Sequence, residues 1–227
     1  MQPYLLPYIG YWQLLASVDE FVVYDNIQYT KKGWINRNRF LRGGRDVLFS
    51  VPLAKASDYL DVREREIAPA YDPKALLAQL AGAYGKAPFY AQTRPLLEDV
   101  LASPERNLFA FLHAGLQRTA AHLGIDTTIR VSSTVDVDHG LTGQDKVLAL
   151  CAALGATTYV NPIGGVELYA RDDFAAHGIE LRFLRPLPLE YEQLGDPFVP
   201  WLSIVDVLMF NELATVRGWL ASHYELV

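Results

Sequence analysis

The residues best suited to chemistry lie in the first forty positions of the 227-residue chain. The opening MQPYLLPYIGYW combines amide and phenol side chains, which suit recognition of a sugar or nucleoside ring by stacking and hydrogen bonding. We predict that this ring is bound by Gln2, Tyr4, Tyr8 and Tyr11. Any one tyrosine alone would more often lie at the edge of the core, and it is the neighbouring basic run that favours a binding role.

Six cations and no acid lie between Asn26 and Arg45, although the whole chain has a net charge of −6. Such a cluster in an acidic protein favours a small anion over a nucleic acid. Arginine binds phosphate or carboxylate in a bidentate manner, and lysine supplies a point charge. We predict that the anion is bound by Lys31, Lys32, Arg37 and Arg39, with Lys32 also catalytic. Cations beside Gly43 and Gly44 could instead protect an exposed strand edge.

The same region supplies the other candidates. Asp25 ends the apolar run EFVVYD and is the expected general base, with a turn-capping role as its equal rival. Gln28, Trp34 and Asn36 are expected to contact the substrate. If NRNR is extended, Asn36 and Asn38 share one face while Arg37 and Arg39 share the other, so one pair would face the site.

Element patterns predict an α/β protein with a single domain over 1–227. The expected elements are a helix at 11–17, strands at 20–25, 34–41 and 46–53, a possible edge strand in the charged run 61–68, a mainly helical segment around 72–124, strands at 127–134, 157–162 and 179–186, helices at 142–155 and 166–178, and one or two final helices. The late strand–helix alternation calls for parallel strands. We therefore predict an open, mainly parallel Rossmann-like sheet with helices on both faces.

Ligands of such sheets gather beyond the carboxyl ends of the strands. Ser132 and Asn161 follow two predicted strands, and Gly164 and Gly165 precede a predicted helix. A glycine pair there lets backbone N–H groups approach an anion, although an ordinary turn would also use glycines. We predict binding roles for all four. Asp206, in the apolar tail, is expected to be a buried partner for one of the cations.

Composition narrows the remaining possibilities. Cys151 is the only cysteine, so a disulfide framework is excluded, and we expect a packing thiol in a reducing cytoplasm. His113 and His122 are expected to pack, and the histidine spacing predicts no metal site. The sequence does not identify a cofactor, and no metal is expected. No apolar stretch is long enough for a membrane span, the N-terminus lacks the features of a signal peptide, and a homo-oligomer is possible.

The chain resembles the WbqC-like family. The matching features cover nearly its whole length and include MQPYLLPYIGYWQL, DEFVVYDNIQYTKKGWINRNR, SSTVD, LGATTYVNPIGGVELY and PFVPWLSIVDVLMFN. The resemblance implies a step in making or modifying a sugar or amino-sugar precursor for O-antigen, other surface polysaccharides or natural products. Relatives usually carry a few more apolar residues before MQPY, enough for a full first strand. The expected first strand of this chain is therefore either cut short at its start or confined to Met1–Tyr4.

The opening also looks like nucleotidyltransferase-like Rossmann folds, but Tyr8 and Gly10–Tyr11 stand where those folds place an H-x-G-H pair, so adenylyl transfer is not carried over. Our leading hypothesis is a transferase or ligase-like enzyme that modifies a nucleotide-linked or carboxylated (amino) sugar. The alternative is a non-catalytic anion- or nucleotide-sugar-binding or scaffold protein of a biosynthetic complex. An enzyme predicts a concave pocket where Tyr4, Asp25, Lys32 and Asn36 converge, whereas a scaffold predicts a flat patch.

Overall fold

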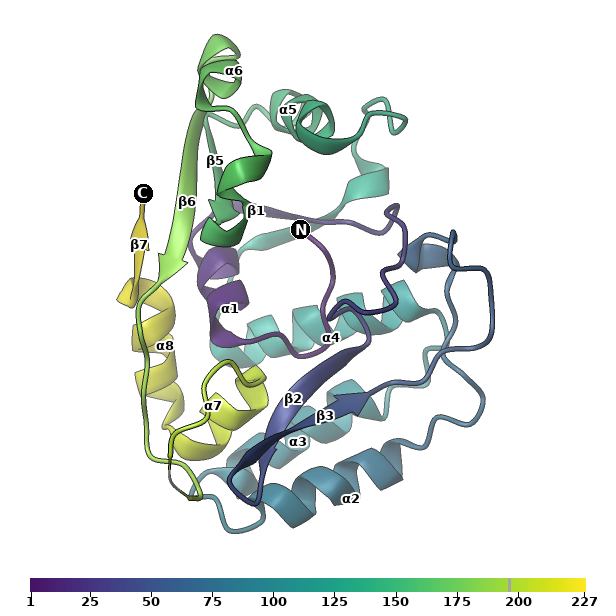
Figure 1. Cartoon of the computed structure of the whole chain (residues 1–227), viewed down its shortest axis with the longest axis vertical. Helices are drawn as coiled ribbons and strands as arrows, with labels where there is room; N and C mark the ends of the chain where they lie inside the picture. The colour runs from purple at the N-terminus through teal and green to yellow at the C-terminus, as the bar shows by residue number, and fades with distance from the viewer. Residues whose placement is uncertain (196) are drawn as a thin grey trace.

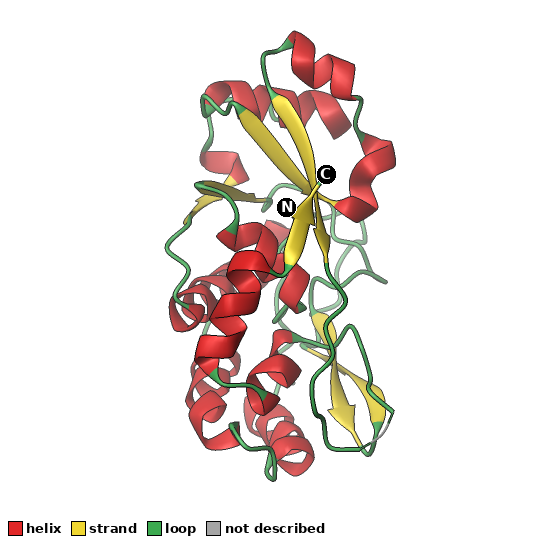
Figure 2. Ribbon diagram, turned by 90° about the vertical axis from the view of Figure 1, so that its left-hand side faces the viewer, coloured by secondary structure: helices red, strands yellow, loops and turns green. Residues whose placement is uncertain are grey.

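The computed structural model describes residues 1–195 and 197–227 and has a mixed α/β fold (Figure 1). Its strands form three short sheets (Figure 2). The parallel pair is β1–β4, the antiparallel hairpin is β2–β3, and in the third sheet β6 lies between the parallel β5 and the antiparallel β7. The strands are β1 (Glu20–Val23), β2 (Arg37–Arg42), β3 (Arg45–Ser50), β4 (Thr128–Val131), β5 (Thr158–Pro162), β6 (Glu180–Pro186) and β7 (Tyr224–Leu226).

The predicted helical middle is confirmed. It consists of three helices: Asp72 caps the first by accepting from the Lys74 N–H, the second has no side-chain cap, and Asn107 caps the third. Gly124 ends the third helix in the left-handed conformation. The α-helices are α1 (Ile9–Ala16), α2 (Pro73–Tyr84), α3 (Tyr90–Leu101), α4 (Leu108–Leu123), α5 (Gly143–Ala153), α6 (Arg171–Ala176), α7 (Ile204–Phe210) and α8 (Leu213–Ser222).

The predicted single Rossmann-like sheet is not formed as one hydrogen-bonded sheet by the described residues. The strand β4 pairs with β1, in the register of Phe21 opposite Ile129, instead of joining β5. The antiparallel β7 was not predicted, and it adds to β6 at the far edge. The parallel pairs that do form are β1–β4 and β5–β6, so the predicted parallel pairing is correct in part.

Short 3-10 helices replace two predicted elements. The charged run 61–68 contains η1 (Val62–Glu64) and isolated bridges, not a regular edge strand, because Asp61 and Glu64 form a reciprocal capping box. The predicted helix at 166–178 is divided into η3 (Ile163–Leu168) and α6. A third short helix, η2 (Ser132–Thr134), follows β4 directly.

Two clusters of buried apolar side chains hold these elements. The larger joins α1, β1, the β2–β3 hairpin and the helices α2, α3, α4, α7 and α8, with Trp12 and Tyr84 fully buried in it. The smaller packs α5 and α6 on β6, around Phe174 and Phe183. None of the helices in the described residues is both long and apolar enough to cross a membrane.

Candidate functional site

The N-terminal segment is a turn that is fixed by hydrogen bonds from distant residues. The Leu5 N–H donates to the Ile35 carbonyl at 3.0 Å, and the Asn38 amide donates to the carbonyls of Leu5 and Leu6 at 2.9 and 2.8 Å. The Ser203 hydroxyl donates to the Leu6 carbonyl at 2.6 Å. Leu6 has φ +44°, a left-handed conformation that a leucine holds only when its surroundings determine it.

The predicted ring-binding residues divide into supporting and accessible groups. The Tyr11 hydroxyl donates to the Gln2 carbonyl at 3.0 Å, and Tyr11 itself is buried. The Tyr4 hydroxyl donates to Gln2 Oε1 at 3.2 Å, and Tyr4 and Tyr8 remain partly exposed. Burial raises the pKa of all three phenols, so they are neutral hydrogen-bonding groups at pH 7. Tyr4 and Tyr8 can therefore face a ligand, with Tyr11 behind them.

Tyr8 also meets an exposed tryptophan from the other end of the chain. The rings of Tyr8 and Trp201 lie edge to face with centroids 5.9 Å apart, and Trp201 is 66% exposed. Trp201 has φ +60°, which is rare for a bulky residue. Backbone strain of this kind gathers at functional sites. Sequence reasoning missed Trp201, because the bond that brings its segment here, from the Ser203 N–H to the Arg39 carbonyl, joins residues far apart in the chain.

Trp34, Arg37 and Arg39 form one cluster. The alternation predicted a shared face for the two arginines but not the contact with Trp34, which precedes β2. The Arg39 guanidinium carbon lies 4.8 Å from the Trp34 ring centroid, and that of Arg37 lies at 5.7 Å, so both are within cation–π range. Arg39 also pairs with Asp46 at 3.0 Å. Arg37 donates to the carbonyls of Gly33 and Lys32, which closes the preceding turn. The result is an aromatic face flanked by two guanidinium groups.

The lysines of the turn are exposed. Lys31 lies 3.6 Å from Asp58, and the Gln28 amide donates to the Asp58 carbonyl at 3.0 Å. Within the described residues Lys32 has no ion-pair partner. Asn36 faces the interior, where it accepts from the Tyr29 hydroxyl at 2.7 Å and donates to the Val51 carbonyl at 2.8 Å. Lys32 is thus able to meet an anion, whereas both ends of the Asn36 amide are already occupied.

Asp25 is buried at the carboxyl ends of β1 and β4. Its Oδ1 accepts from the Ser132 hydroxyl at 2.9 Å and from the Ser133 N–H at 3.0 Å, and Arg63 Nη1 lies 3.8 Å from Oδ2. Burial alone would raise the pKa of Asp25, but the bonds from Ser133 and Ser132 outweigh it and the net pKa is lowered. A general base works best with a pKa near the operating pH, so this geometry favours an anchoring carboxylate.

Further polar groups surround Asp25 that sequence reasoning did not assign to the site. The Ser132 hydroxyl is also 2.6 Å from Asn26 Oδ1, and Asn26 Nδ2 is 3.0 Å from His139 Nδ1. Burial lowers the pKa of His113, and the charge of Asp25 opposes that shift. The buried Nε2 of His113 has no hydrogen-bond partner among the described residues. Arg63 reaches Asp25 because the two loops that carry them pair with each other, and no sequence pattern predicts that pairing.

The glycine pair after β5 is not an open anion cradle. A Cβ on Gly165 would lie 2.1 Å from the Asn161 amide nitrogen, so that side chain covers the glycine. The Tyr159 hydroxyl donates to Asn161 Oδ1 at 3.1 Å. Gly164 has open space beside it. Asn161 lines a cavity between β5 and β1 and makes no hydrogen bond to Asp25 or Lys32 in the described part of the chain.

Asp206 was predicted to pair with a cation, and this prediction is wrong. Its carboxylate accepts from the hydroxyls of Tyr84 and Tyr191 and from the Gln193 amide, each at 2.7 Å. Burial raises the pKa of Asp206 despite these bonds. Neutral donors replace the expected cation because the two phenols already lie in the core beside α7.

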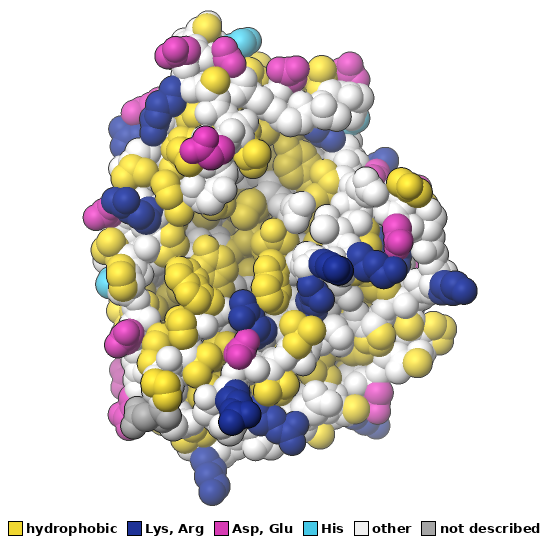
Figure 3. All heavy atoms as spheres, in the orientation of Figure 1, with side chains coloured by type: hydrophobic (Ala, Val, Ile, Leu, Met, Phe, Trp, Pro, Cys, Tyr) yellow, Lys and Arg dark blue, Asp and Glu magenta, His cyan; other side chains and the backbone are white. Residues whose placement is uncertain are grey.

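The predicted residues therefore form connected groups, not one closed pocket. The N-terminal turn, the Trp34 cluster and the Trp201 segment are joined by the bonds to Ile35, Asn38 and Arg39. Figure 3 shows basic side chains across the middle and lower part of one face, below a hollow lined with apolar side chains. No group of three or more His, Cys, Asp or Glu suited to a metal occurs among residues 1–195 and 197–227.

Comparison with known proteins agrees with the resemblance seen in the sequence. The profile of the WbqC-like protein family matches residues 2–217. The chain is 30% identical over 223 residues to the uncharacterized protein Rv1507c of Mycobacterium tuberculosis, an alignment that covers 97% of this chain and 95% of the relative. No solved structure is significantly similar. The chain belongs to the WbqC-like family.

Proposed function

We propose that the chain is a transferase or ligase-like enzyme that modifies a nucleotide-linked or carboxylated (amino) sugar in surface-polysaccharide or natural-product biosynthesis. The observation that carries this proposal is the aromatic face of Trp34 between the guanidinium groups of Arg37 and Arg39. A planar ring can stack on such a face while the flanking arginines bind its phosphate or carboxylate.

The neighbouring groups fit the same ligand. Lys32 is exposed at the end of this face and would neutralise the anion, acting as the cation nearest the transferred group. Tyr4, Tyr8 and Trp201 offer a second aromatic surface with neutral phenols that can bind sugar hydroxyls. We further propose a cytoplasmic protein, since its substrates would be activated sugars, with Asp25 and Ser132 ordering the carboxyl ends of β1 and β4 beside the substrate.

The alternative is a non-catalytic binding or scaffold protein that takes the same anion. It is favoured by the state of Asp25, because a carboxylate whose pKa is lowered and whose Oδ1 accepts two hydrogen bonds is a weak general base. The two functions use the same binding residues, and they differ in turnover and in the expected shape of the surface, which is a concave pocket for the enzyme and a flat patch for the scaffold.

The test is a product search. The chain is incubated with pairs of nucleotide sugars and carboxylate or amine acceptors, and new masses are sought by mass spectrometry. The enzyme predicts a product that disappears in Lys32→Ala and persists in Lys86→Ala, a matched change at an exposed lysine outside the site. A nucleotide sugar that binds without forming product with any acceptor would favour the alternative.

A further inference from the structure

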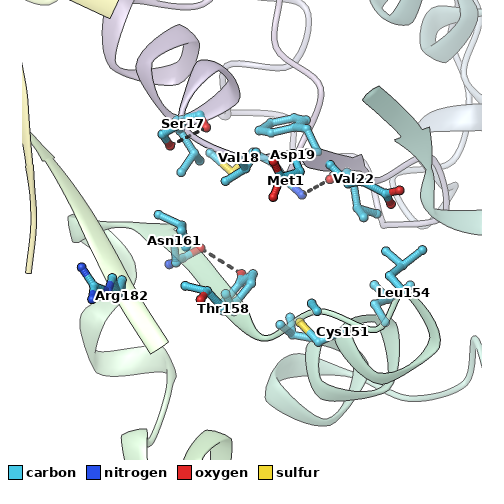
Figure 4. Close-up of a pocket in the computed structure, with 18 of the residues that line it drawn as sticks. Met1, Ser17, Val18, Asp19, Val22, Cys151, Leu154, Thr158, Asn161 and Arg182 are labelled. Atoms are coloured by element: carbon cyan, nitrogen blue, oxygen red, sulfur yellow. Dashed lines mark hydrogen bonds between the residues drawn. The ribbon is translucent and has the colours of Figure 1, made fainter. Parts of the chain in front are cut away.

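A second group of polar side chains lies where β1, β5 and the start of α5 meet. Figure 4 shows Asn161 of β5 and Cys151 of α5 on one side of the cavity between the two strands, and Val22 of β1 on the other. Tyr24 follows β1 at its carboxyl end, and Lys146 is the fourth residue of α5. The group shares no residue with the Trp34 cluster, so its role is independent of the proposed function.

Lys146 is a buried lysine without a partner. It is only 8% exposed, and within the described residues its ammonium makes no ion pair and no hydrogen bond. Lysine is almost never buried unless it is paired, because removing an ammonium from water is costly. Its Nζ lies 5.5 Å from the centroid of the Tyr24 ring, and this cation–π contact offsets part of that cost. The Nζ is not one of the fully enclosed, unpartnered polar atoms of the described residues, so a small ligand can reach it.

The start of α5 offers backbone donors beside this ammonium. Thr142 precedes the helix without a side-chain cap. The N–H groups of Gly143, Gln144 and Asp145 have no acceptor among the described residues, and the Asp145 carboxylate is exposed to solvent. Side chains of a helix lean toward its N-terminus, so Lys146 leans over this first turn. Free N–H groups at a helix start bind anions, and Gly143 has open space beside it.

Neutral phenols add hydroxyl donors to the group. The Gln144 side chain accepts from the Ala170 N–H at 2.7 Å, which holds the Tyr169 segment beside the start of α5. The hydroxyls of Tyr159 and Tyr169 lie 3.4 Å apart, and the Tyr24 hydroxyl has no hydrogen-bond partner in the described part of the chain. Burial raises the pKa of Tyr24, and the nearby Tyr169 phenol raises it further. The Tyr24 hydroxyl is therefore protonated at pH 7 and able to donate.

We propose that the start of α5, together with Lys146, Tyr24 and Tyr169, binds the phosphate group of a small molecule. Across residues 1–195 and 197–227 no carboxylate is bonded to these three side chains, so their donors face an acceptor that the protein does not supply. A phosphate group presents enough oxygens to accept from the ammonium, the free N–H groups and a phenol together. A carboxylate has fewer oxygens, so a phosphate fits this set of donors better.

The test follows backbone amides by two-dimensional NMR while inorganic phosphate, and in a second series pyrophosphate, is added at constant ionic strength. We expect saturable shifts of the Gly143, Gln144 and Asp145 amides. Lys146→Met should weaken this binding about tenfold or more, because a charge-assisted hydrogen bond to the phosphate is lost. Lys74→Met is the matched control, since Lys74 is an exposed lysine in the first turn of α2, and it should bind like the parent chain.

Thermal unfolding supplies the second measurement. In phosphate-free buffer Lys146→Met should be at least as stable as the parent chain, because an unpaired buried cation is removed, and the rise in Tm that phosphate gives the parent should be lost. If Lys146→Met does not fold, Tyr24→Phe decides, since it keeps the ring, removes the free hydroxyl and should weaken binding several-fold. Three results would overturn the proposal: equal binding by the parent and the decisive variant, no shift at the start of α5 up to about 50 mM pyrophosphate, where a site with a Kd of about 1 mM is saturated, or shifts confined to residues 32–39.

Discussion

Replacing Asp25 by asparagine tests how the carboxyl end of β1 is built. The change keeps the shape of the side chain and removes its charge. Oδ1 can still accept from the Ser132 hydroxyl and the Ser133 N–H, but both bonds lose their ionic character. The amide nitrogen then stands near Arg63 in place of Oδ2, so the 3.8 Å ion pair is lost.

The magnitude follows from these contacts. A hydrogen bond to a charged group contributes about 1.5–3 kcal/mol and a neutral one about 0.5–1.5 kcal/mol, so two bonds weaken by about 1 kcal/mol each. The half-exposed Arg63 pair adds little after solvent screening. We expect the free energy of unfolding at pH 7 to fall by about 2 kcal/mol, which lowers Tm by roughly 4–8 °C in a chain of this size.

The pH dependence identifies the carboxylate as the cause. Because the pKa of Asp25 is lowered on folding, its contribution is fully present above the unfolded pKa of about 3.9 and is lost as the pH falls through the lower folded value. Urea unfolding of both proteins should therefore show a constant difference from pH 8 to about pH 5, which shrinks below pH 4. Equal stability at pH 7, or a difference that persists unchanged at pH 3, would refute this reasoning.

Three further predictions concern the turn, the core and the N-terminus. A Cβ on Gly10 would lie 2.5–2.6 Å from side-chain atoms of Tyr8, so Gly10→Ala should displace that side chain and weaken ligand binding several-fold. The control is Gly82→Ala, since Gly82 has open space around it. This change should leave the Kd unchanged and raise the free energy of unfolding by about 0.5–1 kcal/mol. Asp206→Asn should lower the free energy of unfolding by about 1–3 kcal/mol, because its amide turns a donor toward a phenol or the Gln193 amide; an unchanged urea midpoint would contradict the network. The Met1 ammonium has a folded pKa of about 5 and an unfolded one near 8, so unfolding takes up a proton between these values and stability should rise from pH 5 to pH 8. This slope should flatten in a variant with Met-Gly-Ser-Gly-Ser fused before Met1, which moves the ammonium away from its buried position, and an identical slope in that variant would contradict the assignment.

Sequence patterns predicted the turns and helix ends, because these depend on residues that are close together in the chain. The hairpin at Gly43 and Gly44 formed because both residues adopt positive φ, and α4 ends where Gly124 adopts the left-handed conformation. The pairing of β1 with β4 joins residues more than a hundred positions apart, and no pattern within either strand encodes it. The Rossmann-like sheet was expected from strand order alone, and strand order does not reveal that β1 and β5 lie in separate sheets on either side of a cavity.

The candidate site divides in the same way. Arg37 and Arg39 share a face of β2 because alternate residues of a strand do, and this was predicted from their spacing. Trp34 joins them through the turn that Arg37 closes on Gly33 and Lys32, which the spacing did not predict. Arg63, His139 and Trp201 reach the same region through loops that meet only after folding. Asp206 was assigned a cation because a buried carboxylate usually needs one, and two phenols with one amide fill that role instead.

The central claim, an anion-and-ring site between Trp34 and the N-terminal turn, is tested most directly by titration calorimetry with a panel of nucleotide sugars and carboxylated sugars. We predict that at least one compound binds, and that Lys32→Ala and Arg39→Lys each weaken it about tenfold or more, because one removes the exposed cation and the other the stacked planar fork. Lys86→Ala should bind like the parent chain. Binding that is equal in all four proteins, or no binding by any compound in the panel, would contradict the claim.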